Sequence, residues 1–308
     1  MIDYSTPPAG RRPARRYPPG RRPPRWGLAG IVAALAVAAA LLVGHELTSR
    51  TAPTPHRAAA GPVESQAQPL QLGACVDPTL SIEQSFAPAI RHDLAAALGG
   101  LAPETGPPPT GSATAPRPAT SLLVREVDTT SFSSDPGPYA ASVAVPGVPG
   151  LSSARPVPSD PNYASDLATW SQAAEGVTAG EKAAAAGAAS AARTVAALPL
   201  DQNPNSNSAI TACVSALLVN SAPGGRHSYL LASDLEENVA PQLQGSFGGA
   251  PLIMIQTCDS GDVTACQALL RHFETLMHRL DVGPITVIRP EEAGPDITQW
   301  IRTGEVTP

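Results

Sequence analysis

The stretch LQLGACVDPTLSIEQSF (residues 70–86) determines how the rest of the chain is interpreted. Its first seven residues form an apolar run, which is the pattern of a strand buried on both faces of a parallel sheet. Asp77 ends the run, and Thr79 and Ser81 follow at alternate positions. A tight loop after the strand can therefore direct one carboxylate and two hydroxyls at a single point. An apolar repeat over 81–98 predicts a helix directly afterwards.

Two interpretations of this stretch are open at this point. Oxygen ligands in such a loop suit a hard cation, because Mg²⁺ prefers oxygens and keeps several of its waters. Alternatively, Thr79 or Ser81 caps the helix that starts at Ile82, and Asp77 is favourable near the positive end of its dipole. The choice depends on what the other strand ends carry.

The rest of the chain alternates apolar strands with amphipathic or alanine-rich helices, which predicts an α/β fold with a three-layer, doubly wound, mostly parallel sheet of about six strands. Two Pro-rich loops are expected near 100–119 and 147–163. A polar connection suggests a hairpin or an antiparallel edge between the second and third strands. The expected strands are 70–76, 120–127, 139–148, 227–233, 250–257 and 283–290, and the expected helices are 81–98, 165–198 with a break near Gly176 or Gly180, 207–220, 264–280 and 291–302.

The N-terminal part of the chain has a different composition. Residues 1–25 hold seven arginines and one acidic residue, whereas the whole chain has a formal net charge of −6. Residues 26–44 are 19 uncharged residues, which as a helix would span about 28 Å and match the hydrocarbon core of a bilayer. A cleaved signal peptide is the alternative, but no small-x-small site follows closely. We expect a disordered cytoplasmic Arg/Pro-rich tail, a transmembrane helix, a linker over 45–69 and an extracytoplasmic domain over 70–302.

The four cysteines all follow the expected transmembrane helix and therefore lie in an oxidising compartment, where an even number suggests two disulfides. Three pairings are possible. We favour Cys258 with Cys266, which closes a short local loop, and Cys75 with Cys213 as a long-range link. Buried free thiols are the alternative.

The arrangement of oxygen ligands resembles the von Willebrand factor type A (vWA) domain and its metal-ion-dependent adhesion site (MIDAS). That family has a strand leading into Asp-x-Ser-x-Ser, a Thr from a later loop before a helix, and an Asp after the next strand. Here VDPTLS supplies Asp77, Thr79 and Ser81, and YLLASDLEEN supplies Asp234. The order of elements fits from Leu70 to Arg302. The resemblance implies an interaction domain that binds a protein partner through Mg²⁺, or Mn²⁺ or Ca²⁺.

The third part of this motif has more than one candidate residue. NPNSNSAITACVSALL supplies Ser208 before a buried helix, with Ser206 and Thr211 as competitors. A serine here replaces the family's usual threonine, and Leu235 stands where the family usually has Gly after its second Asp. Both departures bear on the affinity for a metal.

Other kinds of chemistry find little support. The acidic body argues against a nucleic-acid partner, which needs clustered cations. The histidines have no zinc-site spacing, and Glu236 and Glu237 suit a helix start after Asp234. We therefore expect a non-enzymatic, membrane-anchored binding protein, with a metal-free structural component of an envelope complex as the alternative. A hydrolase would rest only on Asp77 and Ser81, and no base is placed to activate a hydroxyl.

Overall fold

A computed structural model of the chain describes residues 67–78, 85–103, 113–127, 140–199, 208–257 and 263–307. All the described residues belong to the second of the two units into which the chain divides, Pro62–Pro308. The expected transmembrane segment, 26–44, lies outside them. Among the helices in the described ranges, none is both long enough and apolar enough to cross a membrane.

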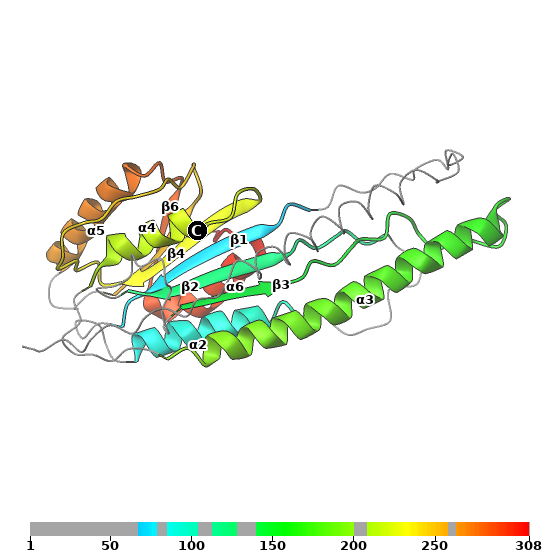
Figure 1. Ribbon diagram of the computed structural model, residues 1–308, viewed down its shortest axis with the longest axis horizontal. Coiled ribbons are helices and arrows are strands. Elements are labelled where there is room, and N and C mark those ends of the chain that lie inside the picture. The colour runs from blue at the N-terminus through cyan, green and yellow to red at the C-terminus, as the bar shows by residue number, and fades with distance from the viewer. Residues whose placement is uncertain are drawn as a thin grey trace, which may run out of the picture. The chain divides into compact units, whose positions relative to one another are not determined.

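The second unit contains a six-stranded sheet in the order β3-β2-β1-β4-β5-β6 (Figure 1). All neighbouring strands are parallel except β2 and β3, which pair antiparallel, so the expected hairpin lies at one edge. The α/β class, the mostly parallel sheet and the antiparallel edge are confirmed. The strands are β1 (Leu70–Val76), β2 (Thr120–Glu126), β3 (Ala140–Val145), β4 (Arg226–Ser233), β5 (Leu252–Gln256) and β6 (Ile285–Ile288).

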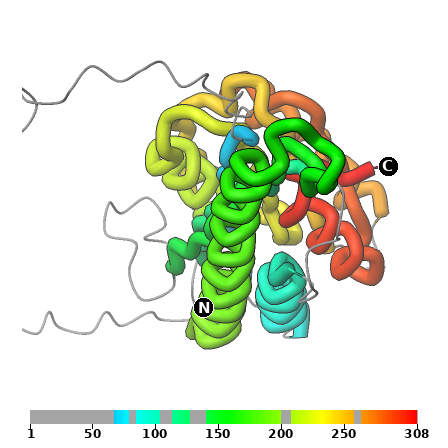
Figure 2. Tube along the Cα trace, turned by 90° about the vertical axis from the view of Figure 1, so that its right-hand side faces the viewer, coloured from blue at the N-terminus to red at the C-terminus, as the bar shows by residue number. Residues whose placement is uncertain are grey.

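Helices cover both faces of the sheet. One face is packed by α2 (Phe86–Gly99), α3 (Tyr163–Ala196) and α6 (Ala293–Thr303), and the other by α4 (Ile210–Asn220) and α5 (Val263–His278). A short 3₁₀ turn, η1 (Pro290–Glu292), precedes α6. Figure 2 shows α2 and α3 side by side.

The two faces form two hydrophobic cores, because successive residues of a strand point to opposite sides. In β1, Leu72, Ala74 and Val76 belong to the core under α2, α3 and α6, whereas Cys75 belongs to the core under α4 and α5. All four side chains are buried. This explains the almost unbroken apolar run with which the strand is encoded.

Helix α3 corrects one expectation. It runs without a break over 34 residues, although Gly176 and Gly180 suggested an interruption. Gly180 lies against Pro149 so closely that a Cβ would come within 2.7 Å of the proline ring, so packing accounts for the missing side chain here. Gly176 has open space around it and is simply tolerated within a long helix.

Parts of the two expected Pro-rich loops pair with each other. Thr114 forms an antiparallel bridge with Leu151, and Arg117 forms one with Val148. Val148 and Leu151 are both buried in the core that α3 covers. These residues form a two-stranded ribbon that continues the β2–β3 hairpin, so the segment after β3 is not only a surface excursion as expected.

Candidate functional site

The carboxyl ends of β1 and β4 bring two of the candidate ligands to one edge of the sheet. The strands are parallel neighbours with Val76 opposite Ala232, so Asp77, directly after β1, lies level with Ser233, the last residue of β4. The Asp77 amide donates to the Ala232 carbonyl at 2.9 Å. The chain leaves β1 for β2 on one side and later returns to β4 on the other, which makes this edge the switch point where open α/β sheets bind ligands.

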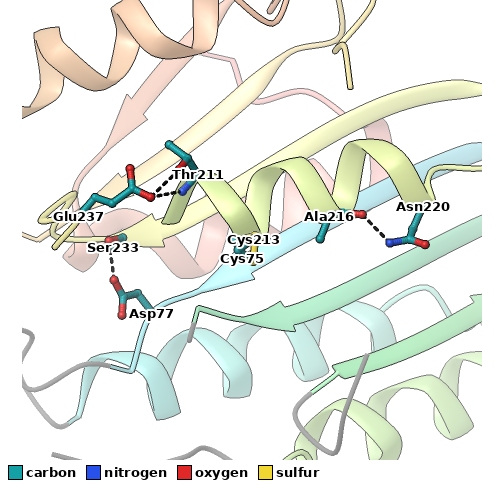
Figure 3. The surroundings of a disulfide bond; sticks show 8 residues. All are labelled: Cys75, Asp77, Thr211, Cys213, Ala216, Asn220, Ser233 and Glu237. Carbon is teal, nitrogen blue, oxygen red and sulfur yellow. Dashed lines mark hydrogen bonds between the residues drawn. A yellow bond between two sulfur atoms is a disulfide. The ribbon is translucent and has the colours of Figure 1, made fainter. Parts of the chain in front are cut away.

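Asp77 is fully buried, and its carboxylate is held by a hydrogen bond from Ser233. Ser233 was not among the residues predicted for the site. The Ser233 hydroxyl donates to Asp77 Oδ2 at 2.8 Å (Figure 3). The same hydroxyl accepts from the Leu235 amide at 3.0 Å. A signal for Ser233 was present, because it is a hydroxyl residue that ends a strand directly before Asp234.

Asp234 is nearly buried, with 9 % of its surface exposed. Its Oδ1 accepts from the Glu236 amide at 2.9 Å, a turn that aspartate side chains commonly form with their own backbone. Its Oδ2 is buried and has no hydrogen-bond partner among the described residues. Burial of a carboxylate oxygen without a donor or a cation is costly, so this atom is an acceptor available to a ligand at the rim.

Leu235 follows with φ of 65°, in the left-handed region. That conformation costs a non-glycine residue about 1–2 kcal/mol. The Leu235 side chain is buried in the core under α4 and α5, and this burial offsets the strain. The leucine is therefore compatible with the turn after Asp234.

The segment before α4 brings Ser208, which is buried two residues ahead of the helix. Thr211, the described alternative to Ser208, already forms hydrogen bonds with other residues. Its hydroxyl donates to Glu237 Oε1 at 2.5 Å and accepts from the Gln242 amide at 2.8 Å. Ser206, Thr79 and Ser81 lie outside the described residues.

Glu237 corrects a second expectation, since residues 234–238 adopt no helix. Its carboxylate instead accepts from both the amide and the hydroxyl of Thr211, in the first turn of α4. Amides at a helix start lack intrahelical partners, and a negative charge there is favourable for the helix dipole. Glu237 thus caps a helix that precedes it in the chain (Figure 3).

The disulfide between Cys75 and Cys213 is confirmed and joins β1 to α4. The two residues are 138 positions apart, with Cα atoms at 6.2 Å, and both are fully buried. Cys266 is disulfide-bonded as well. Cys258, its expected partner, lies outside the described residues.

Three cross-links therefore surround the rim. The Ser233–Asp77 hydrogen bond joins the ends of β4 and β1, the Cys75–Cys213 disulfide joins β1 to α4, and the Glu237–Thr211 contact joins α4 to the segment after β4. Each segment that carries Asp77, Ser208 or Asp234 is tied to both of the others. Such a closed set of links holds side chains in place before a ligand arrives.

The donor set defines which cation could fit. Within the described ranges there is no group of three or more His, Cys, Asp or Glu residues that could hold a metal. The rim offers carboxylates and hydroxyls instead. Asp234 Oδ2 and Thr257 Oγ1, at the ends of the neighbouring strands β4 and β5, are both buried, and neither has a hydrogen-bond partner in the part of the chain that the structure describes. Oxygen donors in small number fit a hard cation that retains waters, such as Mg²⁺.

The chemical character of the site thus rests on Asp77, Ser233 and Asp234 at the switch point and on the links that fix them. Comparison of the chain with protein-family models, curated proteins and solved structures gave no significant match.

Proposed function

We propose that the chain is a membrane-anchored protein whose extracytoplasmic domain, residues 70–302, is a vWA-like module that binds a protein partner. The proposal is supported by the motif resemblance and by the order of elements around it. It assigns no catalytic residue to the chain.

The observation that carries the proposal is that Asp77 and Asp234 follow neighbouring parallel strands, β1 and β4, at the same edge of the sheet. Asp234 directly follows Ser233, and Ser233 contacts Asp77 across 156 positions of sequence. The buried and unpartnered Asp234 Oδ2 favours a ligand that brings positive charge or a donor.

A divalent cation, Mg²⁺ or alternatively Mn²⁺ or Ca²⁺, would be held by oxygens of Asp77, Thr79, Ser81, Ser208 and Asp234. When bound, such an ion supplies a coordination position for an acidic side chain of the partner. The chain's own groups orient the site: Ser233 fixes the Asp77 carboxylate, and the Glu236 amide fixes Asp234. Second-sphere hydrogen bonds of this kind are what orients metal ligands in proteins.

The proposed location rests on residues 1–44 and on the disulfide. Arginines before the apolar segment 26–44 keep that end in the cytoplasm and leave the domain outside the membrane. A buried disulfide between Cys75 and Cys213 supports an oxidising compartment, because such bonds are rare in the cytosol.

The metal is tested by thermal unfolding of the full chain in detergent with Mg²⁺ or Mn²⁺ and with chelator. We expect the cation to raise the melting temperature of the wild type, because a ligand that binds only the native state stabilises it. Asp77→Ala and the isosteric Asp234→Asn should abolish this rise. Asp166→Ala, at an exposed position of α3, should retain it. An unchanged wild-type melting temperature would remove the metal from the proposal.

A second candidate is a metal-free structural component of an envelope complex. It is favoured by the Ser233 hydroxyl, which already satisfies Asp77 Oδ2 without an ion. Capture of partners with and without chelator separates the two candidates. Capture that does not depend on the cation supports the metal-free form.

A further inference from the structure

The amino edge of the sheet, opposite the rim, carries three arginines. Arg226 opens β4, Arg117 precedes β2, and Arg302 lies in the last turn of α6. Arg226 lies in register with Leu70, and Leu70 with Thr120, so these strand starts share one edge. These three arginines lie near one another at this edge, where together they can attract an anion.

A cleft of about 360 Å³ opens at this edge. Its volume falls within the range of small-molecule sites in proteins. Two arginines reach it, and its remaining walls are mostly apolar or backbone. No acidic residue is among the described residues that line it, which are Gly100, Leu101, Ala102, Arg117, Pro118, Thr120, Val145, Pro146, Val148, Ala184 and Arg302.

Both arginines retain donor groups for a ligand. The main chain of Arg117 is fixed by two hydrogen bonds with Val148, of 2.9 and 3.0 Å, while its guanidinium makes no hydrogen bond or ion pair within the described ranges. Arg302 donates to the Gly100 carbonyl at 3.5 Å, at the outer limit of a hydrogen bond. A guanidinium carries five N–H donors. Neither positive charge is neutralised by a carboxylate of the described chain.

The walls of the cleft are preformed. A Cβ at Gly147 would meet the Arg117 carbonyl at 2.7 Å, which shows how tightly the ribbon packs beside Arg117. Pro118 and Pro146 restrict the backbone on either side. Val145 and Val148 are buried in the core beneath α3. A ligand therefore enters a shaped site and does not have to order it, which lowers the entropic cost of binding.

We propose that this cleft binds a small amphipathic carboxylate, with its anionic head between Arg117 and Arg302 and its hydrocarbon body against Leu101, Val145 and Val148. Arginine recognises carboxylates through paired, charge-assisted hydrogen bonds, and apolar walls favour a hydrocarbon chain. The site is distinct from the rim and does not depend on the proposed metal.

The test is calorimetric titration of the full chain with decanoate. We expect saturable binding that is at least tenfold weaker in Arg117→Gln and in Arg302→Gln, because each variant loses hydrogen bonds to a charged group. Arg271→Gln, at an exposed position of α5, should bind like the wild type. Shortening the ligand to octanoate should weaken binding by about fourfold for each methylene lost.

The ligand series separates a specific site from general attraction. Decanamide, which is neutral, should bind at least tenfold more weakly than decanoate. Tighter binding of decyl phosphate than of decanoate would overturn the assignment to carboxylates. Absence of decanoate binding, or equal loss in Arg271→Gln and the two cleft variants, would overturn the site. Both cleft arginines are exposed, so their replacement should leave the fold intact. Circular dichroism of each variant checks that a loss of binding does not come from misfolding.

Discussion

Two buried hydroxyls one helical turn apart, Thr211 and Ser215, hold the irregular segment between β4 and β5. The Thr211 hydroxyl contacts Glu237 and the Gln242 amide. The Ser215 hydroxyl donates to the Gln242 carbonyl at 2.6 Å and accepts from the Gln244 amide at 2.9 Å. The segment has no helix or strand, and main-chain groups of Gln242 and Gln244 instead form hydrogen bonds with side chains of α4. The position of Asp234, at the start of this segment, depends on those contacts.

Glu237→Ala should lower the free energy of unfolding by about 1–3 kcal/mol, because it leaves the amide and the hydroxyl of Thr211 without their acceptor. Glu237→Gln keeps an acceptor oxygen and should lose less. Urea denaturation of the full chain measures both changes.

The neighbouring residue provides the control. Glu236 is exposed and its carboxylate makes no hydrogen bond or ion pair with described residues, so Glu236→Ala should change stability by less than about 0.5 kcal/mol. Equal losses in Glu236→Ala and Glu237→Ala would show that charge, and not the contact with Thr211, stabilises the segment.

Helix α3 shows how the same residue type has different effects along one element. Gly187 faces Pro146, and an added Cβ would come within 2.5 Å of the proline ring, whereas Gly176 has nothing within 4 Å. Both glycines lie inside the helix, where alanine is intrinsically favoured. Contact with the ribbon that follows β3 therefore decides the effect of a substitution.

Gly176→Ala should stabilise the domain by about 0.5–1 kcal/mol, because it reduces the backbone freedom lost on folding. Gly187→Ala should destabilise it by about 1–3 kcal/mol, because the new methyl group overpacks against Pro146. Thermal unfolding of the two variants measures the difference. Stabilisation by both substitutions would contradict the packing of α3 on the ribbon.

The described domain as a whole is two cores separated by one sheet, and each core has its own long-range link. Under α2, α3 and α6, the buried Trp300 donates from its indole nitrogen to the Ser228 hydroxyl at 2.8 Å. Under α4 and α5, the Cys75–Cys213 disulfide joins the central strand to a helix. The disulfide therefore closes a loop of the chain that contains every element between β1 and α4.

Replacing both cysteines, Cys75→Ala with Cys213→Ala, should lower the free energy of unfolding by about 2–5 kcal/mol, because a disulfide that closes a long loop restricts the unfolded chain strongly. Replacing Cys258 and Cys266 by alanine should have a smaller effect, since the expected pair encloses a short loop. Guanidinium denaturation of the two double variants measures this. A larger loss from the short-loop pair would contradict the expected connectivity.

Much of the fold could be predicted from local patterns. The strand at 70–76 was assigned correctly because a buried parallel strand is encoded by a continuous apolar run, and Asp77 interrupts it. The antiparallel edge at β2 and β3 was predicted because its connection is polar. The continuity of α3 was not, since a glycine has no local signal that tells whether it breaks a helix or fits against a proline.

Some residues of the candidate site could also be predicted from local sequence patterns. Asp77 and Asp234 were identified because each follows an apolar run, and parallel strands of one sheet end at the same edge. Ser233 and Glu237 were not selected, although both contact a candidate residue directly. Their partners lie 156 and 26 positions away, and no local spacing encodes such a contact.

The amino-acid order alone specified the succession of strands and helices, the residue types at the strand ends and the apolar N-terminal segment, because these depend on periodicity and composition over short windows. Folding in three dimensions assigned the partners: Ser233 to Asp77, Glu237 to Thr211, and two arginines to one cleft. The reason is physical. A hydrogen bond depends on atoms brought within about 3 Å by the packing of whole elements, and that packing is a property of the complete chain.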